Sequence, residues 1–143
     1  MKVVLCTGGF DPLHSGHIAF FREASKLGDE LIIGLNSDSW LTRKKGAPFM
    51  PWHERYVILQ ELWMVTDVIA FNDSNGTAID AIHIVQAQWP EHEIVFANGG
   101  DRTHLTTPET QVPGITFAFG VGGFDKKNSS SAILENYKKV LAN

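Results

Sequence analysis

The chain has 143 residues and contains little of three things: cysteine, long apolar runs and basic charge. Cys6 is its only cysteine, so no internal disulfide can form, which fits a reducing compartment. The apolar run at residues 3–6 is far too short to span a membrane, and the N-terminus does not have the layout of a signal peptide. We therefore expect a cytoplasmic protein that has no membrane partner and forms one domain over residues 1–143.

Acidic residues outnumber basic residues. The chain carries 12 Lys and Arg against 16 Asp and Glu, which gives a formal net charge of −4 at pH 7. A protein that binds nucleic acid broadly needs a basic face to neutralise phosphates. We therefore expect no nucleic-acid partner, while a local basic cluster around a small anionic ligand is compatible with this charge.

Short apolar runs alternate with segments of helical spacing along the whole chain. The predicted strands cover residues 3–6, 31–35, 65–71, 93–97 and 115–119, and the predicted helices cover residues 18–27, 52–62, 77–88 and 130–141. This alternation predicts an α/β fold, a Rossmann-like parallel five-stranded sheet with helices on both faces. Ligands of such sheets bind at the carboxyl ends of the strands. We therefore expect the chemistry in the loops at residues 7–17, 36–48, 98–102 and 120–131.

The loop after the first strand combines glycines with two histidines. Gly8 and Gly9 allow a ligand to approach the backbone closely, and the helix that begins near Ser15 presents an N-terminus suited to anions. His14 and His17 are three residues apart and project from one face of the first helical turn. Two imidazoles with backbone donors can bind a triphosphate, although a plain turn with surface histidines is the alternative. The loop has neither a Walker sequence nor the dinucleotide glycine spacing.

Residues 9–17, Gly-Phe-Asp-Pro-Leu-His-Ser-Gly-His, resemble the signature of the cytidylyltransferase-like nucleotidyltransferases, with its His-x-Gly-His core. The resemblance implies that His14 and His17 contact the triphosphate and stabilise the pentacoordinate transition state. We expect further nucleotide contacts from the same loop, through Thr7, Gly8, Gly9 and Phe10.

Residues 27–38 are similar to the second strand of that family and to the loop that helps form its acceptor pocket. Asp38 could bind an acceptor hydroxyl there, or cap a short helix. Arg55 matches an arginine of the relatives that binds the acceptor side or a phosphate, and it could equally be a surface residue beside Glu54. Asp11 is a further expected acceptor contact.

The basic run at residues 43–45 lies in a predicted loop, residues 43–48. Such a run is usually a solvated face, but relatives carry at this place a lysine that reaches the phosphates. Lys45 with Gly46 matches heptose-phosphate adenylyltransferases, whereas Lys44 falls into register with glycerol-phosphate cytidylyltransferases. Both lysines therefore stay candidates for the catalytic role.

Two later segments complete the predicted nucleotide pocket. A Gly-Gly-Asp sequence follows the fourth strand, as in heptose-phosphate adenylyltransferases, and a serine run precedes the closing helix, where it could cap the helix or bind phosphate. The expected nucleotide contacts here are Asn98, Gly100, Asp101, Ser129, Ser130 and Ser131. Lys127 is an expected acceptor contact near the place where glycerol-phosphate cytidylyltransferases carry an arginine, whose bidentate fork a lysine cannot form.

These features predict an enzyme that moves NMP from CTP or ATP to a small phosphorylated sugar or polyol and releases pyrophosphate. We expect a Mg²⁺ ion held mainly by the nucleotide phosphates and no dedicated protein metal site. The resemblance implies a homodimer, and Trp40, Trp52 and Trp63 lie in the region that relatives use for acceptor binding and pairing, unless they belong to the core. An adenylyltransferase of a phosphorylated cofactor precursor and a non-catalytic nucleotide sensor are the alternatives.

Overall fold

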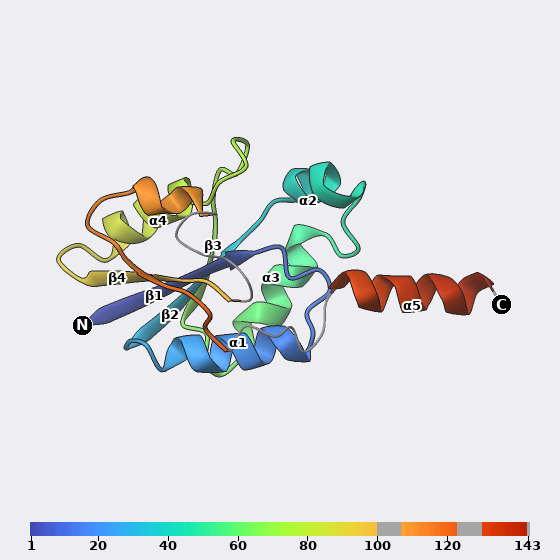
Figure 1. The fold of residues 1–143 in the computed structure, drawn as a ribbon, viewed down its shortest axis with the longest axis horizontal. Coiled ribbons are helices and arrows are strands. Elements are labelled where there is room, and N and C mark those ends of the chain that lie inside the picture. Colours follow the sequence, from blue (N-terminus) through green and yellow to red (C-terminus); the bar gives the residue numbers. More distant parts are fainter. Residues whose placement is uncertain (100–106, 123–129, 143) are drawn as a thin grey trace.

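The structure is a computed structural model that describes residues 1–99, 107–122 and 130–142 (Figure 1). Its strands are β1 (Lys2–Gly8), β2 (Glu30–Leu35), β3 (Asp67–Ala70), β4 (Glu93–Ala97) and β5 (Thr116–Ala118). Its helices are α1 (Ser15–Ser25), α2 (Asp38–Lys45), α3 (Trp52–Gln60), α4 (Ile79–Gln88), the short 3₁₀ helix η2 (Pro108–Gln111) and α5 (Ser130–Ala142).

The five strands form one parallel sheet in the order β3-β2-β1-β4-β5, which confirms the predicted fold class. The chain builds the sheet outward from β1 to β3 and then returns to the other side of β1 with β4. The strand order therefore reverses between β1 and β4, and in open α/β sheets ligands bind at such a switch point.

Both faces of the sheet are covered by helices, because alternate residues of a strand point to opposite faces. Val4 and Cys6 of β1 pack in one apolar cluster with α1 and α3, whereas Val3 and Leu5 pack in a second cluster with α4. All four side chains are fully buried. Residues 3–6 of the central strand are thus apolar and buried, as the sequence predicts, and helices cover them on both faces of the sheet.

The basic segment at residues 43–45 differs from the sequence-based expectation. The basic run does not lie in a loop: residues 43–45 form the last turn of α2, because the hydroxyl of Ser37 accepts the backbone N–H of Trp40 and caps a helix there. Cations at a helix C-terminus interact favourably with the helix dipole. The loop begins only at Gly46, whose φ of 94° is unfavourable for residues with a side chain.

Helix α5 agrees with the predicted closing helix but projects away from the rest of the molecule (Figure 1). Tyr137, Val140 and Leu141 on its apolar side are 52%, 70% and 67% exposed. Among the described helices, none is both long and apolar enough to cross a membrane.

Candidate active site

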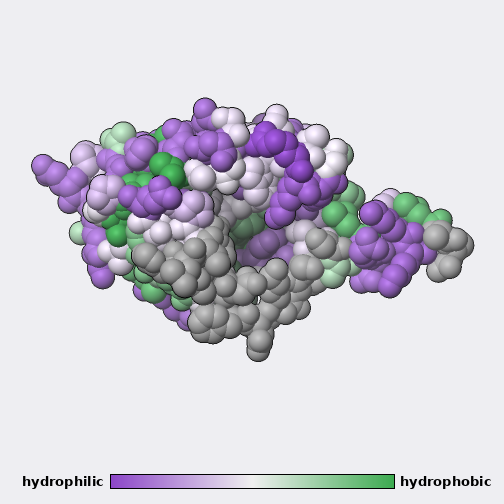
Figure 2. Space-filling model, turned by 45° about the horizontal axis from the view of Figure 1, so that its top comes forward, coloured by the Kyte–Doolittle hydropathy of each residue, from purple (hydrophilic) through white to green (hydrophobic). Residues whose placement is uncertain are grey.

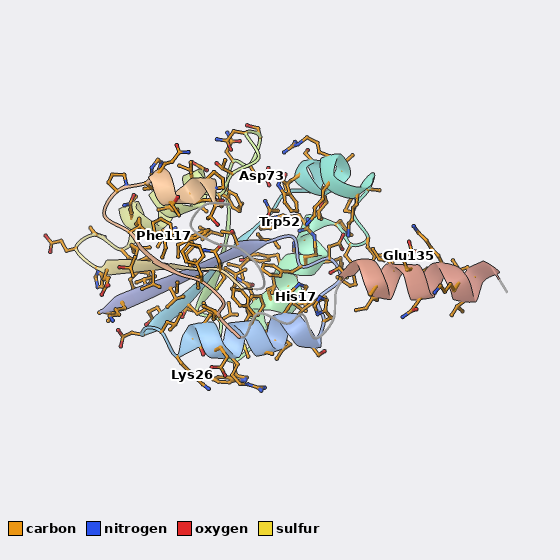
Figure 3. All side chains as sticks on the ribbon, in the orientation of Figure 1. His17, Lys26, Trp52, Asp73, Phe117 and Glu135 are labelled. Carbon is orange, nitrogen blue, oxygen red and sulfur yellow. The ribbon has the colours of Figure 1, made fainter. Side chains whose placement is uncertain are left out.

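The loop after β1 joins the switch point to the N-terminus of α1. The surface is hollowed near its centre in Figure 2. Figure 3 labels His17 of α1, Trp52 of α3 and Asp73 after β3, which come from three separate segments. Trp52 donates from Nε1 to the carbonyl of Leu35 at the end of β2, and Asp73 accepts the backbone N–H of Ser37.

His14 and His17 form a reciprocal cap at the start of α1. The ring Nδ1 of His14 accepts the backbone N–H of Gly16 at 3.0 Å, and the ring Nδ1 of His17 accepts the backbone N–H of His14 at 3.2 Å. This arrangement is a capping box in which two imidazoles replace the usual hydroxyl and carboxylate. The two rings stack with their centroids 3.7 Å apart. The predicted proximity of the two histidines is therefore present.

The cap also fixes the chemistry of the two rings. A neutral imidazole has one acceptor nitrogen and one N–H, so rings that accept at Nδ1 carry their proton on Nε2. Burial lowers the pKa of His14, and burial together with the nearby charge of His14 lowers the pKa of His17 to about 3. At neutral pH both rings are therefore uncharged hydrogen-bond donors through Nε2.

Phe10 packs against the ring of His17. Its aromatic ring meets the rings of His17 and Phe21 edge-on, each at a centroid distance of 5.0 Å. The side chain is buried, and a Cβ atom at Gly8 would lie 2.8 Å from its ring. Phe10 adopts a φ of 49°, a left-handed backbone conformation that is strained for a bulky residue. The short distance from the Phe10 ring to a Cβ atom at position 8 explains why this position is a glycine.

Asp11 holds the loop to the segment that follows α2. Its carboxylate accepts the backbone N–H groups of Phe49 and Met50 at 2.6 and 2.7 Å, and the Nζ of Lys45 lies 2.8 Å from Oδ2. Lys45 also donates to the backbone carbonyl of Asp11 at 2.6 Å. The Asp11 side chain is fully buried. Lys45 therefore lies against the histidine loop.

Lys44 lies elsewhere. Its Nζ is 4.8 Å from the centroid of the Trp40 ring, a cation–π geometry on the surface of α2. The two lysines, between which the sequence does not decide, thus lie in different environments: Lys45 is bound to the buried Asp11, and Lys44 lies over the ring of Trp40.

Arg55 connects the ends of β1 and β2. It is 1% exposed, so it is not the surface residue that the sequence allows as an alternative. Its guanidinium donates to the carbonyls of Gly9, Asn36 and Met50 at 2.8 to 3.0 Å. Its Nη2 also donates to Oδ1 of Asp38 at 2.7 Å. Gly9 and Asn36 directly follow β1 and β2, whereas Asp38 begins α2 and Met50 precedes α3.

Asp38 is the first residue of α2, and its side chain is 44% exposed. It does not cap the helix, because that role belongs to Ser37. Oδ1 of Asp38 forms an ion pair with Arg55, so Oδ2 is the atom left for the predicted contact with an acceptor hydroxyl.

Sequence reasoning missed Asp73, which follows β3. Its carboxylate accepts hydrogen bonds from the backbone N–H and hydroxyl of Ser37, both at 2.8 Å, and from the amide of Asn36 at 3.0 Å. Burial raises the pKa of Asp73, but these hydrogen bonds outweigh it and hold the pKa below its usual value. The rule that polar residues gather after parallel strands could have found it, since residues 72–73 follow the third predicted strand.

The remaining predicted contacts are less completely described. Asn98 is 5% exposed, and its side-chain Nδ2 has no hydrogen-bond partner in the described structure. Ser130 donates from Oγ to the carbonyl of Pro12 at 2.9 Å, which ties the start of α5 to the histidine loop. Thr7 is half-buried in β1. The other predicted contacts, Gly100, Asp101, Lys127, Ser129 and the side chain of Ser131, lie outside the described residues.

Comparisons with known proteins agree with this geometry. The family model described as "Cytidylyltransferase-like" matches residues 5–112. The chain is 38% identical over 112 residues to the bifunctional protein HldE of Enterobacter sp. (strain 638), a match that covers 70% of this chain and 24% of that protein. It is 33% identical over 143 residues to HldE of Helicobacter acinonychis, which covers 97% of this chain and 28% of that protein. The chain thus spans about a quarter of the length of these relatives.

Solved structures show the same architecture. A lipopolysaccharide core biosynthesis protein from Thermoplasma volcanium GSS1 has a TM-score of 0.63 at 28% identity, with 83% of this chain and 93% of that chain covered. A putative nicotinate-nucleotide adenylyltransferase from Vibrio parahaemolyticus has a TM-score of 0.61 at 15% identity, with 96% and 87% covered, and shows the fold alone.

Proposed function

Because the chain belongs to the cytidylyltransferase-like family and is a nucleotidyltransferase, we propose that it transfers AMP from ATP to the phosphate of a small sugar or polyol. The Gly-Gly-Asp sequence at residues 99–101 supports ATP, since heptose-phosphate adenylyltransferases have a similar sequence there. A solved relative whose name refers to lipopolysaccharide core biosynthesis supports a sugar acceptor.

In the proposed reaction a phosphate oxygen of the acceptor attacks the α-phosphorus of ATP. A new phosphorus–oxygen bond forms, the bond to the β-phosphate oxygen breaks, and pyrophosphate leaves with the electron pair. No covalent enzyme intermediate is needed, so the protein contributes positioning and stabilisation of charge.

The histidine pair carries this proposal. His14 and His17 each have Nδ1 occupied by a backbone N–H and Nε2 left to donate, which suits two neighbouring phosphate oxygens. A neutral ring can accept at Nδ1 and donate from Nε2 at the same time, and the N-terminus of α1 adds its partial positive charge.

Lys45 is the lysine that we propose for the phosphates. Its ammonium lies against the histidine loop, where two of its three N–H groups bind Asp11. The third has no partner among the described residues, and we propose that it binds a phosphate oxygen. The remaining oxygen of Asp38 is the proposed contact for an acceptor hydroxyl, and Lys127 remains a proposed contact for the acceptor.

We propose that Mg²⁺ enters with the nucleotide. Among the described residues, no group of three or more His, Cys, Asp or Glu side chains could hold an ion by itself. A Mg²⁺ ion that keeps its waters and binds phosphate oxygens needs few protein ligands, so it can bind here without such a group. When bound, it would neutralise charge on the triphosphate.

Pyrophosphate release tests the reaction. The full chain is incubated with Mg²⁺, one of ATP, CTP, UTP or GTP, and a panel of phosphorylated sugars and polyols. Release with ATP and a sugar phosphate supports the proposal, and release only with CTP would move the enzyme to the cytidylyl subgroup. Tight nucleotide binding with no release in any combination would favour a nucleotide sensor.

A homodimer is a further proposal, supported by exposed apolar side chains in two parts of the chain. Val57 and Ile58 of α3 form one group with Trp63, which is nearby in sequence and 77% exposed, and the apolar side of α5 provides the other. Trp52, in contrast, packs against the core. Sedimentation equilibrium of the full chain tests the assembly, and a monomer at all concentrations would contradict it. A cytoplasmic location also stays a prediction.

A further inference from the structure

Arg55 is the largest fully buried side chain of the described structure, although it carries a charge. A buried cation is stable only when its hydrogen-bonding groups are paired. Four bonds to protein oxygens use at least four of the donor positions of its guanidinium. With five N–H groups in all, the side chain has at most one left for a substrate.

The bond to Gly9 determines how the histidine loop is oriented. Nη1 of Arg55 donates to the Gly9 carbonyl at 2.9 Å. In a trans peptide the C=O and the N–H of the next residue point in opposite directions. The Gly9 carbonyl is turned toward Arg55, so the N–H of Phe10 is turned away from it.

The strained conformation of Phe10 depends on such restraints. A φ of 49° persists in a bulky residue only where the surroundings hold it. Arg55 holds the residue before Phe10 through the Gly9 carbonyl. Asp11, the residue after Phe10, is held by Lys45 and by the backbone N–H of Met50. Because the ring of Phe10 supports His17, a rotation of this peptide would displace His17 as well.

The same guanidinium also reaches the proposed acceptor side. Nη2 binds Oδ1 of Asp38, and Nη1, which binds Gly9, also binds the carbonyl of Asn36 at 2.8 Å. The backbone of Met50 connects Asp11 with Arg55, since its N–H binds the carboxylate of Asp11 and its carbonyl binds the guanidinium of Arg55. One side chain therefore connects the loop after β1 with the loop after β2.

We infer that Arg55 is a positioning residue that couples the acceptor side to the nucleotide loop: it fixes the Gly9–Phe10 peptide, and through Phe10 the ring of His17, relative to Asp38. This rests on the proposed function in that the histidine loop binds the nucleotide. It differs from a direct contact between Arg55 and the acceptor, which the resemblance implies.

The first test compares Arg55→Lys with Arg22→Lys, a matched change on the exposed surface of α1. A lysine keeps the charge but cannot bind acceptors in four directions through a planar fork. Isothermal titration with Mg·ATP should give an affinity about tenfold weaker for Arg55→Lys and unchanged for Arg22→Lys, with both variants folded by far-ultraviolet circular dichroism. Unchanged affinity for ATP with only a higher KM for the acceptor would establish a direct contact and overturn the inference.

Asp38→Asn covers the case in which Arg55→Lys does not fold, because the Asp38 side chain is partly exposed and the three carbonyl bonds of Arg55 stay intact. ATP affinity should fall although Asp38 lies on the acceptor side, and an unchanged affinity would overturn the coupling. NMR of the protein without nucleotide separates this from the function itself. The Phe10 amide and the His17 ring resonances should shift in Asp38→Asn, even if no nucleotide binds the wild-type chain, and unshifted resonances would also overturn the inference.

Discussion

Nδ1 of His17 accepts the backbone N–H of His14, and the imidazole rings of these two residues stack 3.7 Å apart. Together with the bond from the Gly16 N–H to Nδ1 of His14, this bond caps α1. Nε2 of each ring therefore carries a proton that it can donate. A residue with a structural and a proposed catalytic role can be tested only with variants that separate the two.

His17→Gln and His17→Ala provide this separation. A glutamine at the third helical position can accept the capping N–H, whereas alanine cannot. We expect both variants to lose turnover, measured as pyrophosphate release, because neither has an imidazole. Only His17→Ala should also lose about 1 kcal/mol in the free energy of unfolding, measured in urea. Turnover that survives in either variant would contradict the role of His17.

The stability of the protein should fall as the pH decreases from about 6.5 toward 4. The pKa of His17 is lowered to about 3 in the folded protein, below its ordinary value in the unfolded chain, by burial and by the charge of His14. The unfolded state therefore binds more protons in this interval, and each pH unit lowers the free energy of unfolding by about 1 kcal/mol.

Urea unfolding between pH 7 and pH 4 measures this effect, with His17→Gln as the control. The glutamine variant does not titrate, so its stability should change less over the same interval. Parallel pH profiles for the two proteins would show that His17 does not have the lowered pKa.

Replacement of the two lysines should have different consequences. Lys45→Met leaves the buried Asp11 carboxylate without its cation, so we expect a loss of about 2 kcal/mol in unfolding free energy. Lys44→Met removes an exposed cation–π contact, worth about 0.5 kcal/mol. Thermal unfolding compares the two stabilities, and pyrophosphate release at low temperature compares the activities. A loss of activity in Lys44→Met alone would reassign the phosphate contact to Lys44.

Asp73→Asn should lower the free energy of unfolding at pH 7 by about 2 kcal/mol, because the Asp73 carboxylate accepts three hydrogen bonds at the start of α2. The pKa of Asp73 is lowered in the folded protein, so the stability it provides is present above pH 4 and lost as the pH falls further. The difference between wild type and variant, measured by urea unfolding, should therefore shrink at pH 3. A constant difference across this range would rule out the assigned role.

The sequence alone determined the fold class, and it predicted where the candidate site lies. The apolar run of β1 and its alternation with helical segments suffice to predict a parallel sheet, because burial on both faces requires such a pattern. The nine residues from Gly9 to His17 predict the histidine pair, since spacing along one helical turn fixes which side chains meet.

The tertiary structure decided which charged residues are buried and hold the loops together. Arg55 and Asp11 are separated by 44 positions, and nothing local in the sequence indicates that both are buried or that Met50 joins them. The same holds for Asp73, which binds Ser37 across 36 positions. Local patterns determine helices, strands and turns, but the burial of a charge depends on partners that only the folded chain brings together.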